Sequence, residues 1–117
     1  MSKFDALKAQ KCKNIDIKTE ILIEAAGFSF DGVEFLLNPL SREKWLALKT
    51  LESSLSWPVT VSAKVGEYSL AEADLDPFLA IALGIVQTYK DSGRALRLSV
   101  QTATTWEEFY AIQDNRT

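Results

Sequence analysis

The chain has 117 residues, of which 47% are hydrophobic and 25% charged, and this length and composition predict one soluble globular domain with a core of its own. It contains no histidine and a single cysteine, Cys12, which excludes Ser-His triads, histidine metal sites and a disulfide within the chain. The net charge is −3, although residues 1–18 carry five Lys and two Asp, and such a chain lacks the clustered cations that bind phosphates. We therefore expect no nucleic-acid partner.

Residues 1–26 are predicted to form one helix. Its apolar stripe repeats at alternating spacings of three and four residues: Cys12, Ile15, Thr19, Leu22 and Ala26. Towards the start the stripe continues as Phe4, Lys8 and Lys11, which is poorly apolar, and the lysines are interpreted as a solvated helix face. The first half of the helix is therefore expected to project from the domain or to pack on a partner. Gly27 fits the left-handed position that ends many helices.

The thin start of this stripe leads to a binding hypothesis. A helix whose first turns offer few apolar residues contributes little to a core, so its apolar side chains are available to another molecule. The predicted partner contacts are Phe4, Leu7, Ile15 and Leu22. The partner is another polypeptide, and self-association of the chain through this helix is included. The alternative is a helix that covers the sheet, and the sequence does not choose between the two.

The stretch GFSFDGVEF, residues 27–35, predicts a tight β-hairpin. Asp31-Gly32 suits a type I′ turn, because both central residues of that turn need a positive φ. A two-residue loop pairs the strand residues Phe28 with Phe35 and Phe30 with Val33. These four side chains then share one face, which is expected to lie on an apolar support. Binding by the hairpin is expected to use the backbone of an open edge rather than its aromatic rings.

A second helix is predicted to follow the hairpin. Ser41 is its expected N-cap, and Leu40 and Trp45 have the spacing of a hydrophobic staple. The buried line of this helix is expected to consist of Trp45, Leu48, either Leu51 or Glu52, and Leu55.

A second hairpin comes next. Residues 57–64 alternate apolar and polar side chains, which predicts a strand with one buried face. Pro58 cannot donate a ladder hydrogen bond, so the strand is expected to begin at an edge. The chain then turns at Gly66 into a short return strand around residues 68–70.

The last third is predicted to be helical. Asp76-Pro77 and an earlier capping box place the start of a long helix between residues 70 and 77, and Ser92-Gly93 predicts a bend or break near residue 92. Thr104 and Thr105 each precede a Glu by three residues, which predicts a short final helix. The whole is one α+β domain, residues 1–117, with its helices around a small antiparallel sheet.

The sequence predicts no catalytic, cofactor-binding or metal-binding residues. It has no glycine-rich phosphate loop, and its close acidic pairs, Asp74 with Asp76 and Glu107 with Glu108, lie at predicted helix starts where carboxylates complement the helix dipole. We therefore expect a protein that is not an enzyme and has no cofactor. The longest apolar run, residues 78–86, is far shorter than a membrane span, and no signal peptide is recognised, so a cytosolic protein without a membrane partner is expected.

The order of motifs resembles that of a known protein family. The segment KAQKCKNIDIKTEILIEAAGFSFDGVEF combines a Lys-rich helix, an Ile-Asp-x-Lys-Thr step and a Gly-Phe-x-Phe-Asp-Gly hairpin. Ser41 and Trp45, the WPV strand, the YSL return strand and the closing ATTWEEFYAIQD follow in the same order. Residues 8–114 are thereby similar to an uncharacterised domain of bacteriophage tail-fibre-assembly and tail proteins. The individual motifs are turn, cap and core residues, so the resemblance lies in their order.

This resemblance implies a non-enzymatic phage tail protein that binds a tail-fibre or baseplate polypeptide. The favoured role is a tail-fibre assembly chaperone that works in the host cytoplasm during phage assembly. The alternatives are a permanent virion component, such as a fibre or baseplate adaptor in the virion tail, and a host-directed phage protein that binds a bacterial target. The resemblance carries over no catalytic or ligand residues.

Overall fold

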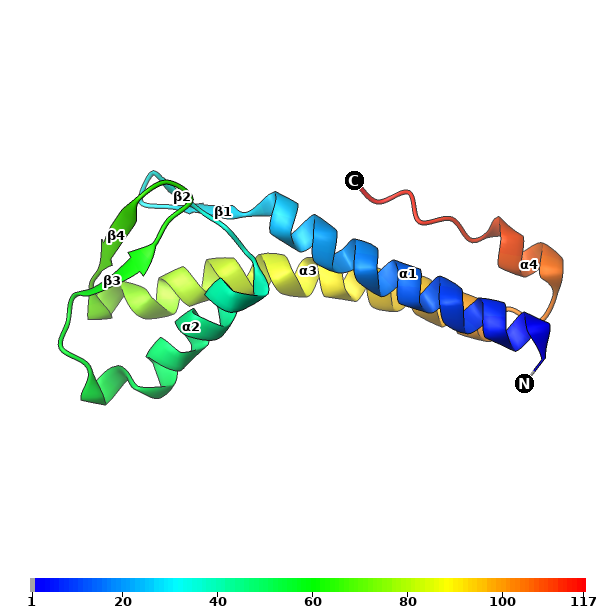
Figure 1. Ribbon diagram of the computed structural model, residues 1–117, viewed down its shortest axis with the longest axis horizontal. Helices are drawn as coiled ribbons and strands as arrows, with labels where there is room; N and C mark the ends of the chain where they lie inside the picture. The colour runs from blue at the N-terminus through cyan, green and yellow to red at the C-terminus, as the bar shows by residue number, and fades with distance from the viewer. Residues whose placement is uncertain (1) are drawn as a thin grey trace. The chain divides into compact units, whose positions relative to one another are not determined.

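The computed structural model describes residues 2–117 and has an α+β fold (Figure 1). The order of elements confirms the predicted succession of helix, hairpin, helix, hairpin, long helix and short helix. The helices are α1 (Lys3–Ala26), α2 (Pro39–Thr50), α3 (Leu75–Thr102) and α4 (Trp106–Ala111), with short 3-10 turns at Glu52–Ser54 and Glu72–Asp74. The strands are β1 (Phe28–Phe30), β2 (Val33–Phe35), β3 (Val59–Ser62) and β4 (Glu67–Leu70).

The domain predicted from the sequence contains two compact units. The helical unit consists of residues 2–22 together with Thr88–Thr117, and the mixed unit consists of Ile23–Gln87. Both long helices therefore contribute to both units: α1 passes from the first into the second after residue 22, and α3 returns after residue 87.

The first hairpin of the mixed unit has the predicted turn and register. Asp31 and Gly32 have φ angles of 52° and 74°, as a type I′ turn requires. The paired residues are Phe28 with Phe35, Ser29 with Glu34 and Phe30 with Val33. Phe28 and Phe35 are buried, and their rings pack against Trp45 of α2 with ring-centroid distances of 5.5 and 6.3 Å. The aromatic face of the hairpin is therefore part of a core, as the alternation predicts.

This core unites elements that are distant in the sequence. The Phe78 ring of α3 lies 5.0 Å from that of Phe35 and 5.2 Å from that of Trp45, both at nearly right angles, which is a favourable geometry for aromatic pairs. The buried hydrophobic residues of the mixed unit are Ile23, Phe28, Phe35, Leu37, Trp45, Val61, Leu70, Leu75, Phe78, Leu79, Ala82 and Val86.

Helix α2 begins earlier than the sequence predicts. Its N-cap is Asn38, whose side-chain oxygen accepts a hydrogen bond from the backbone N–H of Ser41 at 2.8 Å. Pro39 then occupies the first turn, where its lack of an N–H costs nothing. The prediction that Ser41 caps the helix is wrong, because an Asn-Pro pair offers both a better cap and a fixed φ three residues upstream. Trp45 is buried, as predicted.

Replacing Asn38 by alanine is expected to lower the free energy of unfolding by about 1 kcal/mol, because it removes the acceptor for a first-turn N–H. Ser41→Ala is the matched control and should cost only a few tenths of a kcal/mol, since its N–H rather than its hydroxyl takes part in the cap. Urea denaturation followed by circular dichroism measures both. A larger loss for Ser41→Ala than for Asn38→Ala would contradict the observed helix start.

The two hairpins form separate two-stranded sheets instead of one small sheet. Strands β3 and β4 pair antiparallel, with Val59 opposite Leu70 and Ser62 opposite Glu67. The backbone N–H of Lys64 donates to the carbonyl of Glu34 at 2.8 Å, which joins the turn of the second hairpin to β2. Among residues 2–117, β4 is the strand that pairs with β3, and β2 meets the outer edge of β3 at the hydrogen bond from Lys64.

Helix α3 starts within the predicted window and does not break where a break is predicted. It begins at Leu75, directly after a 3-10 turn, and continues through Ser92 and Gly93 to Thr102. Of the bend or break predicted near residue 92, the break does not occur. Gly93 is buried, and a side chain there would meet Thr19, so its small size serves close packing with α1 rather than a helix end.

The helical unit has its own core. Its buried hydrophobic residues are Ile15, Val100, Ala103 and Phe109, from α1, α3, the connection to α4 and α4 itself. Thr105 caps α4 as predicted, accepting a hydrogen bond from the N–H of Glu108 at 3.1 Å. Within this unit, Ile15, Phe4 and Leu7 of α1 thus pack on a core that α3 and α4 complete.

Candidate functional site

A groove in the mixed unit lies between α2 and β3. Its volume is about 540 Å³. Helix α2 contributes Leu40, Lys44, Trp45 and Leu48 to its walls, among others. Strand β3 contributes three consecutive residues: Thr60, Val61 and Ser62. Because successive side chains of a strand point to opposite faces, a groove that touches three in a row lies along the edge of the strand.

This edge of β3 is open at Thr60 and Ser62, although two residues further on the Lys64 N–H bonds to Glu34 of β2. The N–H of Ala63 donates to the carbonyl of Gly66 at 3.0 Å, which makes these two residues a hydrogen-bonded pair beside the turn. Hydrogen-bonded and non-hydrogen-bonded pairs alternate along an antiparallel ladder. Thr60 and Ser62 therefore belong to non-hydrogen-bonded pairs, and their backbone N–H and C=O groups point away from β4. They point to the side of the strand that borders the groove.

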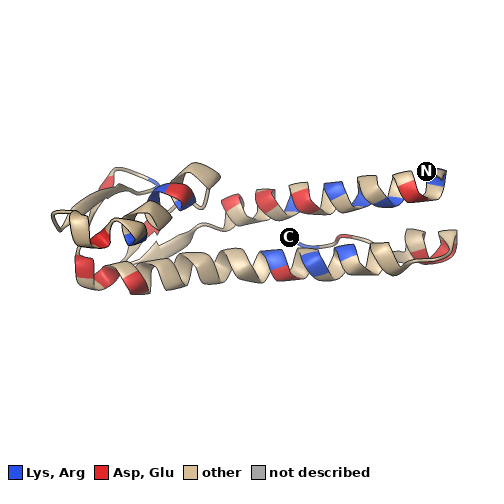
Figure 2. Ribbon diagram, turned by 90° about the horizontal axis from the view of Figure 1, so that it is seen from below, with Lys and Arg blue, Asp and Glu red and all other residues tan. Residues whose placement is uncertain are grey.

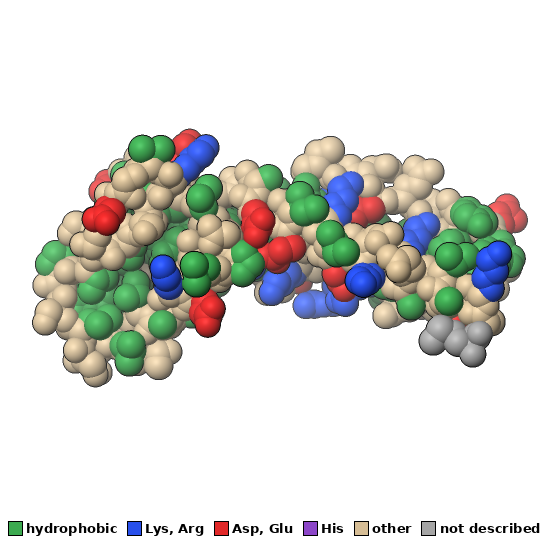
Figure 3. Space-filling view, in the orientation of Figure 1, with side chains coloured by type: hydrophobic (Ala, Val, Ile, Leu, Met, Phe, Trp, Pro, Cys, Tyr) green, Lys and Arg blue, Asp and Glu red, His purple; other side chains and the backbone are tan. Residues whose placement is uncertain are grey.

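The walls of the groove combine apolar and polar residues with one cation. Among the apolar ones, Trp45 is 3% exposed, Leu48 is half-buried and Leu40 is 61% exposed. Lys44 is exposed, and no ion pair involving it occurs among residues 2–117. Figure 3 shows hydrophobic side chains gathered over the part of the molecule that carries α2 and the hairpins. The site thus combines unpaired strand backbone, apolar side chains and a positive charge.

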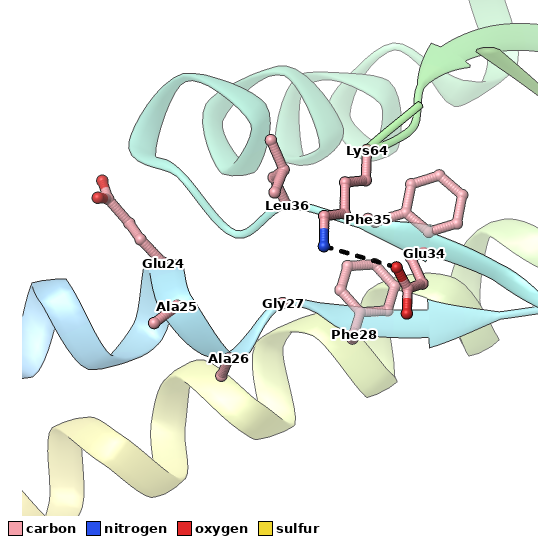
Figure 4. A pocket seen from close by; sticks show the side chains of 9 residues that line it. All are labelled: Glu24, Ala25, Ala26, Gly27, Phe28, Glu34, Phe35, Leu36 and Lys64. Atoms are coloured by element: carbon pink, nitrogen blue, oxygen red, sulfur yellow. Dashed lines mark ion pairs between the residues drawn. The ribbon is translucent and has the colours of Figure 1, made fainter. Parts of the chain in front are cut away.

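A second hollow in the mixed unit lies where α1 ends and β1 begins (Figure 4). Its volume is about 100 Å³, which is below the roughly 300–1,000 Å³ of ligand pockets. Gly27 has a φ of 54°, and a Cβ there would lie 2.7 Å from the carbonyl oxygen of Phe35. Lys64 and Glu34 form an ion pair of 3.7 Å at its rim. This hollow is a by-product of the tight passage from helix to strand.

The four predicted partner contacts lie in the helical unit, and three of them pack in or against its core. Ile15 is 3% exposed and forms part of the core, and Phe4 and Leu7 are half-buried against the same core. The Phe4 ring lies 4.8 Å from that of Trp106 of α4. Leu22 is also half-buried. The prediction that these residues await a partner is therefore corrected for Ile15, Phe4 and Leu7, whose apolar atoms pack within the chain.

The lysines of α1 explain why a poorly apolar helix start can pack internally. The Lys8 ammonium donates to the carbonyls of Gln101 and Ala103, both at 2.9 Å, and that of Lys11 donates to Phe109 O at 2.8 Å. Carbonyls at helix ends lack intrahelical donors and attract cations. Figure 2 shows this recurrence of Lys along α1. The interpretation of these two lysines as a purely solvated face is wrong.

A cluster of polar side chains around Arg116 ties the last residues to the helical unit. The guanidinium of Arg116 binds both carboxylate oxygens of Asp114, at 2.6 and 2.8 Å, and both side chains are less than a fifth exposed. It also donates to the Thr19 hydroxyl at 2.9 Å, the Ser92 hydroxyl at 3.1 Å and the Ile15 carbonyl at 3.1 Å. The cluster satisfies its own donors and acceptors, so its role is structural.

The carboxylate of Asp114 should make the helical unit sensitive to acid. Its hydrogen bonds from Arg116, supported by the nearby Lys18, hold the pKa of Asp114 below its ordinary value. A carboxylate with a lowered folded-state pKa stabilises the fold above about pH 4, and this contribution is lost as the pH falls through the lowered pKa. The free energy of unfolding should therefore fall more steeply below pH 4 in the wild type than in Asp114→Asn. Equal slopes would contradict a role for this pair.

Within residues 2–117, no helix has the length and apolar character needed to cross a membrane, and no group of three or more His, Cys, Asp or Glu side chains is arranged to hold a metal. The groove residues Lys44, Thr60 and Ser62 carry no sequence signal of their own, since only the fold brings an edge strand next to α2. Phe4, Leu7, Ile15 and Leu22 do not line this groove. No family model, no curated protein and no solved structure matches this chain.

Proposed function

We propose that this protein is a non-enzymatic binding protein that takes hold of another polypeptide. The observation that carries this proposal is the open edge of β3 beside the apolar groove. Unpaired strand backbone with apolar side chains next to it is a surface on which proteins receive extended polypeptide segments. The surface belongs to α2 and β3, and it replaces the first turns of α1 as the candidate contact region.

The partner we propose is a bacteriophage tail-fibre or baseplate polypeptide. The order of motifs over residues 8–114, which resembles that of phage tail-fibre-assembly proteins, supports this choice. Long β-rich fibres fold slowly and expose unpaired edges until they assemble, which makes them prone to aggregation. A small protein with an edge-side groove suits the temporary covering of such segments. Its proposed role is that of a fibre assembly chaperone in the host cytoplasm.

Co-expression tests this role. The chain is produced together with the tail-fibre polypeptide of the genome that encodes it, and soluble fibre trimer is measured by size-exclusion chromatography with and without the chain. We expect the yield of soluble trimer to depend on the chain, and the chain to be missing from purified particles by mass spectrometry. Presence in particles would indicate a permanent virion component instead. Co-purification with neither fibre nor baseplate polypeptide would overturn the proposal.

A further inference from the structure

We infer that the groove receives one extended strand of the partner, which adds to the open edge of β3 and brings a carboxylate to Lys44. This inference rests on the proposed function and deepens it by naming the surface and the chemistry of the bound segment. The two neighbours of the groove, α2 and β3, both belong to the mixed unit, so the site is complete within it.

The backbone of β3 selects a strand over a helix. The outward-pointing N–H and C=O groups of Thr60 and Ser62 lie two residues apart, which is the repeat at which a neighbouring strand offers its own N–H and C=O groups. A helix has already used its backbone groups internally and has none to offer at this spacing. An incoming strand can therefore form hydrogen bonds with the outward N–H and C=O groups of β3, whereas a helix leaves these groups without partners.

The side chains of the groove specify what the strand carries. Leu40 and Leu48 line the groove together with the buried Trp45 and offer apolar contact, so the residues of the bound strand that face α2, every second one, should be apolar. Lys44 is the charged residue that lines the groove. An acidic residue near the end of the bound segment can pair with it, and a basic residue is repelled. The fitting segment is an alternating apolar strand with a carboxylate.

A peptide of alternating Val and Thr with a terminal pair of Glu residues is the probe. Its binding to the full chain is measured by fluorescence polarisation, against the same peptide ending in two Lys. Thr60→Pro removes an N–H from the open edge and leaves the hydrogen-bonded pairs with β4 in place. It should weaken peptide binding about tenfold, because one backbone hydrogen bond to the peptide is lost and the adjacent one is distorted. Ser69→Pro is the matched control, because Ser69 is the ladder partner of Thr60 and its N–H points to the opposite edge.

Two further measurements keep the inference falsifiable if Thr60→Pro does not fold. Two versions of the peptide are N-methylated, one at the odd-numbered and one at the even-numbered amides. Only one of these two sets of amides faces β3, so one version should lose binding to the wild-type chain and the other should keep it. Lys44→Glu should reverse the preference between the Glu-ended and Lys-ended peptides, whereas Lys13→Glu in the helical unit should leave it unchanged. Equal binding of both methylated peptides, or of both charged peptides to the wild type, would overturn the inference, as would the absence of binding at millimolar concentration.

The outcomes separate the inference from the proposed function. If the wild-type chain holds the fibre polypeptide in co-expression and Thr60→Pro holds it equally well, the contact lies elsewhere and the inference fails alone. If the wild type binds the peptide through the groove and ignores the fibre and baseplate polypeptides, the groove stands and the assembly role fails.

Discussion

Replacing Arg116 by alanine is expected to lower the free energy of unfolding by about 2 to 4 kcal/mol, the largest effect of any single substitution proposed for this chain. The guanidinium is 13% exposed and makes short hydrogen bonds to Asp114, Thr19 and Ser92. Its removal leaves the Asp114 carboxylate with Lys18 as its remaining cation, 3.6 Å away, and leaves polar atoms of α1 and α3 without a donor. An orphaned, largely buried carboxylate is costly, and this cost dominates the expected loss.

Urea denaturation at neutral pH measures this loss, with Arg94→Ala as the matched control. Arg94 belongs to the same unit and also pairs with an aspartate, Asp91, at 3.2 Å, but its side chain is 66% exposed. Exposed ion pairs contribute about 0 to 1 kcal/mol, so Arg94→Ala should change little. The double variant Arg116→Met with Asp114→Asn should recover part of the loss, because it leaves no largely buried carboxylate without its guanidinium. Similar losses for Arg116→Ala and Arg94→Ala would show that the Arg116 cluster stabilises the fold no more than an exposed ion pair does.

Gly93→Ala should destabilise the protein by about 1 to 2 kcal/mol, although alanine is the better helix former. An added Cβ would lie 2.5 Å from the Thr19 hydroxyl oxygen and 3.2 Å from a terminal nitrogen of Arg116. Thr19 is buried, and its hydroxyl both donates to Ile15 O and accepts from Arg116, so it cannot move aside without losing these bonds. Overpacking costs about 1 to 3 kcal/mol, which exceeds the gain of about 1 kcal/mol in helix propensity.

Gly84→Ala is the matched control for this prediction, because it makes the same change in the same helix. A Cβ at Gly84 meets nothing within 4 Å, and the position is exposed. Only the propensity gain remains, so Gly84→Ala should raise the free energy of unfolding by about 0.5 to 1 kcal/mol. The two substitutions are thus expected to have opposite signs in thermal or urea denaturation. A stabilising Gly93→Ala would mean that α1 and α3 are not closely packed at this position.

The elements that the sequence predicts correctly depend on local rules. The Asp31-Gly32 turn requires two residues with positive φ in succession, which few residue pairs tolerate, and the turn length then sets the register of β1 with β2. The Thr105 cap and the aromatic face of the first hairpin follow in the same way from spacings of two or three residues. The predicted N-cap of α2, Ser41, lies three residues after the observed one, because two capping signals, Asn38 and Ser41, compete within one turn.

The errors concern contacts between residues that are far apart in the chain. Lys8 and Lys11 read as a solvated stripe, because their acceptors lie 93 to 98 residues away at the ends of α3 and α4. Gly93 is predicted to break the helix, because the sequence around it gives no sign that Thr19 of α1 packs against it. The candidate groove could not be predicted for the same reason, since α2 and β3 are separated in the chain and meet only in the folded mixed unit.

The succession of helices and hairpins, the first turn, its register and its buried face can be predicted locally, because they follow from dihedral preferences and from periodicities of 2 and 3.6 residues. The folded structure sets which side chains are free. It buried Ile15 and packed Phe4 and Leu7 around it, it placed Arg116 among acceptors from three segments, and it left one edge of β3 open beside α2. Exposure is a property of the assembled fold, since a side chain or a backbone group is available only when no distant segment covers it.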